Sequence, residues 1–96
     1  MKVNYEIENE KMVKVITYDN GRVSKYDENG NEIYCKLDSG FQIWYEYDSK
    51  GNLIYRKEST GWQEWYEYDS NGNKIHIRDC MGNEWFAENY EARKVC

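Results

Sequence analysis

The side chains that could take part in chemistry are one histidine, three cysteines and many carboxylates. His76 is the only histidine, and Cys35, Cys80 and Cys96 show no C-x-x-C spacing. A multi-histidine metal site is therefore excluded, and neither a zinc centre nor a disulfide scaffold is expected. The sequence also lacks a glycine-rich phosphate loop, so we expect no metal, no cofactor and reduced thiols.

Carboxylates recur at one fixed interval along the chain, as Asp27, Asp48 and Asp69 and as Glu46, Glu67 and Glu88. Retaining hydrolysis of a glycosidic bond would need one pair of carboxyl groups about 5 Å apart, one of them with a raised pKa. Regular rows single out no such pair, and no Ser/His/Asp arrangement accompanies them. The aspartates are expected to shape turns. The sequence therefore predicts a protein that is not an enzyme.

The fixed interval belongs to an internal repeat. The segment Tyr26–Tyr34 (YDENGNEIY) returns as Tyr47–Tyr55 (YDSKGNLIY) and again as Tyr68–His76 (YDSNGNKIH). Between these segments runs GFQIWYEY in one copy and GWQEWYEY in the next, and a diverged copy follows at residues 82–89. His76 stands where the other copies have tyrosine, which favours a structural role for it over a catalytic one.

Each repeat is expected to form a β-hairpin. The pattern Asp-x-x-Gly-Asn favours a type I turn that ends on a glycine with positive φ. Aromatic and β-branched residues fill the segments between turns, as strands prefer. Val3–Ile7 and Met12–Tyr18 predict one further hairpin at the N-terminus. The predicted fold is all-β: an antiparallel meander of tandem β-hairpins with about nine strands, forming a single-layer or coiled sheet.

Length and composition bound the organisation of the chain. Its 96 residues suffice for a single domain, with an N-terminal hairpin at 1–17, hairpin repeats at 18–89 and a C-terminal tail at 90–96 that holds at most one helical turn. Aromatic residues make up 17% of the chain, which excludes a disordered segment. No apolar run is long enough to span a membrane, and no apolar leader is present, so a cytoplasmic protein is expected.

The unit Gly-x3-Trp-Tyr-Glu-Tyr-Asp-x2-Gly-Asn-x-Ile resembles the YD repeat of the RHS-type proteins, in a short array of about four units over residues 18–89. This resemblance implies stacked hairpins. The chain departs from the family at Asn31, Asn52 and Asn73, where the family usually has arginine. The array is also too short for the toxin-enclosing shell, so neither that function nor any catalytic residue is carried over.

Turn geometry predicts which residues face each other across the sheet. Centring one turn on Lys50 pairs Tyr45 with Tyr55, and placing Thr60-Gly61 in the next loop pairs Tyr55 with Tyr66. The resulting row on one face is Tyr34, Tyr45, Tyr55, Tyr66 and His76, and the row on the other face is Cys35, Trp44, Arg56, Trp65, Ile77 and Phe86. In this arrangement Arg56 lies between two indoles.

The aromatic rows allow three interpretations. They form a core if the thin sheet curls, coils or dimerises. They form a protein-binding surface, because Trp, Tyr and Arg dominate interface hot spots. They stack on sugar rings, because Trp44 and Trp65 are expected two strands apart, about 10 Å at the usual strand spacing.

A net charge of −5 and the missing chemistry favour the second interpretation. The sequence predicts a protein-binding module, a small acidic inhibitor of a basic, nucleic-acid-handling protein of the toxin-immunity or phage anti-defence (anti-CRISPR) type. A carbohydrate-binding module is the alternative. Direct binding of nucleic acid and of membranes is not expected, whereas exposed sheet edges favour a homodimer. The predicted contact residues are Trp44, Trp65, Tyr45, Tyr55, Tyr66, Glu46 and Glu67.

Overall fold

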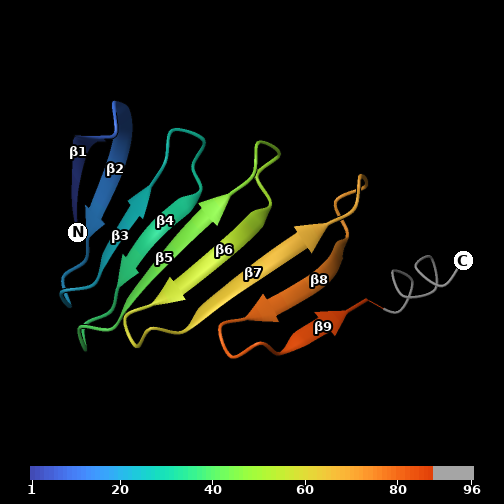
Figure 1. Ribbon diagram of the computed structural model, residues 1–96. Coiled ribbons are helices and arrows are strands. Elements are labelled where there is room, and N and C mark those ends of the chain that lie inside the picture. The colour runs from blue at the N-terminus through green and yellow to red at the C-terminus, as the bar shows by residue number, and fades with distance from the viewer. Residues whose placement is uncertain (88–96) are drawn as a thin grey trace, which may run out of the picture.

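The computed structural model describes residues 1–87, and all regular structure in this range is β-strand. The strands are β1 (Lys2–Glu8), β2 (Lys11–Thr17), β3 (Val23–Tyr26), β4 (Glu32–Lys36), β5 (Gln42–Tyr47), β6 (Leu53–Glu58), β7 (Gln63–Tyr68), β8 (Lys74–Asp79) and β9 (Glu84–Phe86). They pair in sequence order as one antiparallel nine-stranded sheet (Figure 1). The predicted all-β meander of hairpins is confirmed.

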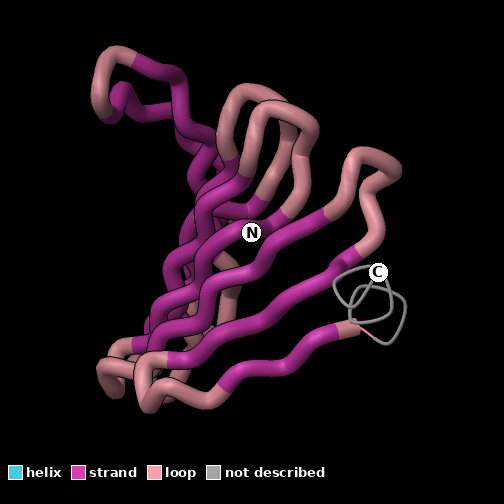
Figure 2. Tube along the Cα trace, turned by 45° about the vertical axis from the view of Figure 1, so that its right-hand side comes forward, coloured by secondary structure: helices cyan, strands magenta, loops and turns pink. Residues whose placement is uncertain are grey.

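Figure 2 shows that the strands form a single twisted layer. The predicted tail at 90–96, the end of the last repeat at 88–89 and Cys96 lie outside the described residues. Within the described range, no helix could cross a membrane.

Seven of the eight turns close with the same pair of backbone hydrogen bonds. In the turn after β5, for example, the Asp48 N–H donates to the Asn52 carbonyl at 2.9 Å and the Gly51 N–H donates to the Asp48 carbonyl at 3.0 Å. Gly51 has a φ of 86°, which glycine adopts without strain. The first turn differs, because Asn9 and Glu10 have φ values of 52° and 66° and form a two-residue type I′ turn.

Three aspartate turns, which begin at Asp27, Asp48 and Asp69, lie along one edge of the sheet, the upper edge in Figure 1, together with the first turn. A fourth turn of the same sequence pattern, at 79–83, lies at the lower edge. Asp48 Oδ1 accepts hydrogen bonds from the N–H groups of Lys50 and Asn52, both at 2.9 Å. Asn52 Nδ2 donates to the other carboxylate oxygen of Asp48 at 3.2 Å. The same bonds recur around Asp27 and Asp69. In these turns the aspartate and the asparagine of the pattern therefore add side-chain hydrogen bonds to the backbone pair.

A β-bulge follows each of the three upper-edge aspartate turns, which begin at Asp27, Asp48 and Asp69. One isoleucine in the strand after the turn has no partner across the ladder, and these residues are Ile33, Ile54 and Ile75. The turns at the lower edge have no such bulge. Strands that carry one extra residue therefore alternate with strands that do not, and the sequence repeat spans one strand of each kind together with their turns.

The bulges overturn the predicted register. Pairing around Lys50 holds beside the turn, where Tyr47 faces Leu53, but beyond the bulge Tyr45 faces Arg56 instead of Tyr55. The next turn is centred on Thr60, so Tyr55 faces Trp65 instead of Tyr66.

Both predicted rows are therefore wrong, because each one mixes side chains from opposite faces. The ring face of the sheet carries Tyr34, Trp44, Tyr55, Trp65, His76 and Phe86. The Arg56 face carries Ser24, Cys35, Ile43, Tyr45, Arg56 and Tyr66.

Two tyrosine hydroxyls tie neighbouring hairpins together. The Tyr47 hydroxyl donates to the Glu32 carbonyl at 2.6 Å, and the Tyr68 hydroxyl donates to the Leu53 carbonyl at 2.7 Å. Each acceptor directly precedes a bulged isoleucine, where the ladder is interrupted. The tyrosine of the Tyr-Asp pattern thus satisfies a polar group that the bulge of the preceding hairpin leaves outside the ladder.

The buried core is small and lies over β2 to β5. Val13 and Val15 are buried on the ring face, and Ser24, Cys35 and Ile43 are buried on the Arg56 face. A single layer cannot bury much more than this. Hydrogen-bonded turns, cross-strand pairs and the two tyrosine hydroxyl bonds, which we call tyrosine caps, therefore contribute a large share of the stability.

Candidate binding surface

Aromatic pairs are stacked along the ring face. Tyr34 on β4 packs against Trp44 on β5 with ring centroids 5.7 Å apart, and Tyr55 on β6 packs against Trp65 on β7 at 5.6 Å. The tyrosine hydroxyls donate to Gln42 Oε1 at 2.9 Å and to Gln63 Oε1 at 2.7 Å. Each pair is therefore fixed both by packing and by a hydrogen bond.

The third pair has different chemistry at the same positions. His76 on β8 stacks on Phe86 of β9, with centroids 4.5 Å apart and the rings tilted by 11°. His76 Nε2 lies 2.9 Å from Glu84 Oε1, where the earlier units have glutamine, and Nδ1 lies 2.6 Å from Glu67 Oε1. His76 occupies the position of Tyr34 and Tyr55 in the register, as the repeat predicts.

Cations approach the rings of this face. Arg78 Cζ lies 4.6 Å from the centroid of the Trp65 ring, and Lys57 Nζ lies 6.0 Å from that of Trp44. The prediction that Arg56 lies between the two indoles is wrong, because the bulge of β6 places Arg56 on the other face. Lys57 and Arg78 supply the cation–π contacts instead.

On its own face, Arg56 belongs to a local polar network. It forms an ion pair with Glu58, and its Nη1 lies 4.0 Å from Glu64 Oε1. The Tyr66 hydroxyl and Trp62 Nε1 both donate to Glu64, the latter at 3.0 Å. Burial alone would raise the pKa of Glu64, but these two hydrogen bonds and Arg56 outweigh it and lower that pKa. Burial and the bond to Glu64 raise the pKa of Tyr66.

Two open grooves lie where neighbouring hairpins diverge at the upper edge. The larger one, of about 910 Å³, lies between the first turn and the turns at 27–31 and 48–51. Its lining includes the carboxylates of Glu8, Asp27, Glu28, Glu46 and Asp48, against the ammonium groups of Lys11 and Lys50. From the sequence we expected the aspartates only to shape turns, so this acidic lining was not predicted. The signal that could have revealed it is the concentration of acidic residues in the turns.

The second groove, of about 400 Å³, lies one repeat further along. It is lined by Asp48, Glu67 and Asp69, with Lys50 as the only basic residue of its lining. A hydrogen bond from the backbone N–H of Asn52 lowers the pKa of Asp48, so this carboxylate stays ionised near neutral pH. Both grooves therefore carry an excess of negative charge.

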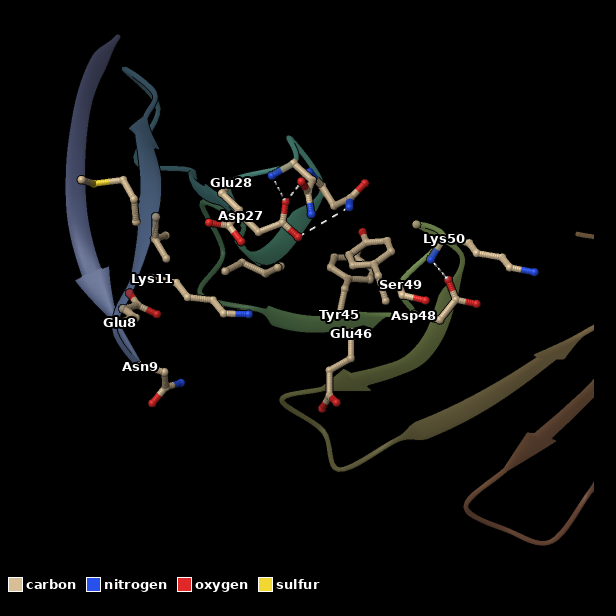
Figure 3. A pocket seen from close by; sticks show the side chains of 17 residues that line it. Glu8, Asn9, Lys11, Asp27, Glu28, Tyr45, Glu46, Asp48, Ser49 and Lys50 are labelled. Carbon is tan, nitrogen blue, oxygen red and sulfur yellow. Dashed lines mark hydrogen bonds between the residues drawn. The ribbon is translucent and has the colours of Figure 1, made fainter.

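The structure divides the seven predicted contact residues between two settings. Tyr45 and Glu46 line the larger groove, and Tyr66 and Glu67 line the smaller one. Figure 3 shows Tyr45 and Glu46 pointing to opposite sides of β5. The other three, Trp44, Tyr55 and Trp65, lie on the ring face. The grooves and the ring face meet at Glu46 and Glu67, whereas Tyr45 and Tyr66 lie on the Arg56 face.

No protein-family model matches the chain, and no curated protein matches it. Cys35 and Cys80 are free thiols, the first buried and the second exposed. In residues 1–87, no cluster of three or more His, Cys, Asp or Glu side chains is arranged to hold a metal ion.

Proposed function

We propose that this protein is a non-enzymatic, protein-binding module that recognises a basic partner through the ring face and the two acidic grooves beside it. The observation that carries the proposal is the charge of the grooves: the larger one is lined by five carboxylates and two ammonium groups. An acidic groove speeds encounter with a basic surface and fixes its register, and adjoining aromatic rings supply apolar contact area.

The partner class follows from the same chemistry. Nucleases and other nucleic-acid-handling proteins carry basic grooves for phosphate backbones. A row of carboxylates spaced along a rigid edge resembles such a backbone in charge, so the protein would act as an antagonist, of the toxin-immunity or phage anti-defence type. We place its action in the cytoplasm.

We also propose that the hairpins are related to the YD repeats of RHS-type proteins. Each element of the pattern has a separate task here: aspartate and asparagine bond each other in the turn, and tyrosine caps the preceding hairpin. Asn52, which stands where that family usually has arginine, donates to Asp48 at 3.2 Å and so adds a side-chain bond to the turn.

Affinity capture from a lysate of the source organism, followed by titration of the captured protein, tests the proposal. Glu46→Lys should weaken binding about ten-fold, because it places a positive charge beside a basic partner. Asp38→Lys, an equal charge change in an exposed lower-edge turn, should leave binding unchanged. Added salt should weaken binding by the wild-type chain. Binding that is insensitive to salt and equally strong for Glu46→Lys and Asp38→Lys would contradict the proposal.

A second pair of variants tests the ring face. Trp44→Ala should weaken the complex, whereas Trp85→Ala, which removes a more exposed tryptophan from the opposite face, should not. A captured nuclease should lose activity towards a labelled oligonucleotide when the chain is added, while the chain alone should not bind that oligonucleotide. Binding to a glycan array that is lost in Trp44→Ala would instead establish the carbohydrate-binding alternative.

A further inference from the structure

The outer edge of β1 is the longest unpaired strand edge in the described part of the chain. β1 has seven residues and pairs with β2 along its whole length without a register shift. The described part of β9, at the other edge of the sheet, has three residues. Proteins usually protect a long edge with charged side chains, a proline, a bulge or a strand that is too short to pair. β1 contains neither a proline nor a bulge, and its charged residues Lys2, Glu6 and Glu8 all lie on the ring face.

The geometry of the first turn determines which backbone groups of β1 face outwards. Glu8 and Lys11 flank the two-residue turn and therefore form a hydrogen-bonded pair. Such pairs alternate along an antiparallel ladder, so the N–H and C=O groups of Val3, Tyr5 and Ile7 point away from β2. These three residues thus offer a complete set of donors and acceptors to another strand.

The same three residues present an apolar row. Their side chains lie on the Arg56 face and are 41%, 65% and 73% exposed. Met12 on β2, the partner of Ile7, is 51% exposed. A hollow of about 580 Å³ beside them is lined by Tyr5, Met12, Lys14, Ile16 and Tyr26, among others. Hydrophobic side chains and unpaired backbone groups therefore coincide at one edge.

We propose that β1 pairs with β1 of a second copy of the chain, antiparallel and about a two-fold axis through Tyr5, so that two nine-stranded sheets become one continuous sheet. In this register Tyr5 faces the partner's Tyr5, and Val3 faces the partner's Ile7. All the outward N–H and C=O groups of these residues then find partners on the other copy.

The strand is complementary to itself in this register. On the ring face, Lys2 faces the partner's Glu8, and Asn4 faces the partner's Glu6. On the Arg56 face, Ile16, Val3, the partner's Ile7 and the partner's Met12 form one apolar row across the junction. A slip of two residues either leaves Glu8 without a facing residue or places two copies of Glu6 opposite each other, which is unfavourable. Charge complementarity therefore favours β1 of a second copy as the pairing strand, and it favours a single register.

This inference is independent of the proposed function, because β1 contributes only Glu8 to the larger groove and nothing to the smaller one. The oligomeric state of the full chain tests it, measured by light scattering coupled to size exclusion at increasing concentration. The expected result is a rise in mass towards that of a dimer. Ile7→Lys should abolish the rise, and Met81→Lys, at a similarly exposed side chain in a lower-edge turn, should not.

Charge exchange tests the register. Lys2→Glu and Glu8→Lys each place like charges opposite each other in a homodimer, so each homodimer should weaken about ten-fold. A mixture of the two variants restores opposite charges at both facing positions and should form heterodimers. Far-UV circular dichroism checks that every variant stays folded. A wild-type chain that remains monomeric, or two charge variants that show no preference for each other, would overturn the proposal.

Discussion

Removing a single hydroxyl group tests whether the tyrosine of each Tyr-Asp pair holds its hairpin to the preceding one. Tyr47→Phe keeps the aromatic ring on β5 but deletes the donor that lies 2.6 Å from the Glu32 carbonyl. That carbonyl sits beside the bulged Ile33, where the ladder offers it no regular partner. We expect a loss of stability without a change of fold.

The size of the loss follows from the kind of bond. A neutral hydrogen bond between partly buried groups contributes about 0.5–1.5 kcal/mol net, so Tyr47→Phe should cost about 1 kcal/mol. For a domain of this size such a loss lowers the melting temperature by about 4–8 °C. Tyr68→Phe deletes the equivalent bond to Leu53, 2.7 Å long, and should cost the same. The double variant should lose close to the sum, because the bonds share no group.

Urea unfolding followed by tryptophan fluorescence gives the free energy of unfolding for each variant. Tyr5→Phe is the matched control at a protein concentration where the chain is monomeric, because this tyrosine is then 65% exposed at the sheet edge and its variant should lose almost no stability.

The pH dependence gives a second readout. Burial raises the pKa of Tyr47 above its usual 10.0, so the contribution of the neutral hydroxyl is complete below pH 10 and falls as the pH rises through the raised value. The difference between wild type and Tyr47→Phe should therefore shrink at alkaline pH. Equal unfolding free energies for Tyr47→Phe and Tyr5→Phe would refute the assigned role of the hydroxyl.

Two further substitutions probe the Arg56 network and a turn. Glu64→Gln should cost about 1–2 kcal/mol near neutral pH, because it weakens charge-assisted bonds from Tyr66 and Trp62. Folding lowers the pKa of Glu64, so the carboxylate contributes fully to stability above the usual pKa of 4.5 and this contribution is lost as the pH falls. When the free energy of unfolding is measured against pH, the curves of wild type and Glu64→Gln should therefore converge in acid. Gly51→Ala should lower the free energy of unfolding by about 1–2 kcal/mol through backbone strain alone, because φ is 86° and no atom lies within 4 Å of the added Cβ. Thermal melting measures this loss, and Gly51→Asn should lower the melting temperature less, because asparagine tolerates a positive φ better than alanine.

The elements of this fold could be predicted from sequence because their signals are local. Asp-x-x-Gly-Asn specifies a turn whose bonds all lie within the pattern itself, as at Asp48 and Asn52. Alternating aromatic and polar residues between the turns specify strands. These two signals determined the order and direction of the strands in the described residues.

The register could not be predicted from such signals, because the isoleucine of Gly-Asn-x-Ile recurs at every bulge but nothing in its residue type shows that it stands outside the ladder. Leu53, Ile54 and Tyr55 are three consecutive apolar residues, and either face accepts any of them. Alternation therefore does not show which residue stands outside the ladder. A shift of one residue exchanges the two faces, which is why Tyr45 and Arg56 were assigned to opposite faces although they lie on the same one.

Part of the candidate site could be predicted, because equivalent positions of the repeat fall on the same face of the sheet. Trp44 and Trp65 were expected on one face and lie there, because both occupy the same place in the repeat. The grooves were missed, since they arise where β4 and β5 stop pairing beyond Tyr34 and only the fold reveals that divergence. The acceptor of the Tyr47 hydroxyl is the carbonyl of Glu32, in the preceding hairpin and beyond any local pattern.

The tyrosine caps give the array a direction. Each acceptor carbonyl belongs to a hairpin already made, and each donor belongs to the hairpin made next, as with Leu53 and Tyr68. On the ribosome, a newly formed hairpin would therefore wait for about one further repeat of chain before its last polar group is satisfied. A chain shortened from its C-terminus would leave an open carbonyl on its final hairpin, whereas one shortened by whole repeats from its N-terminus would not.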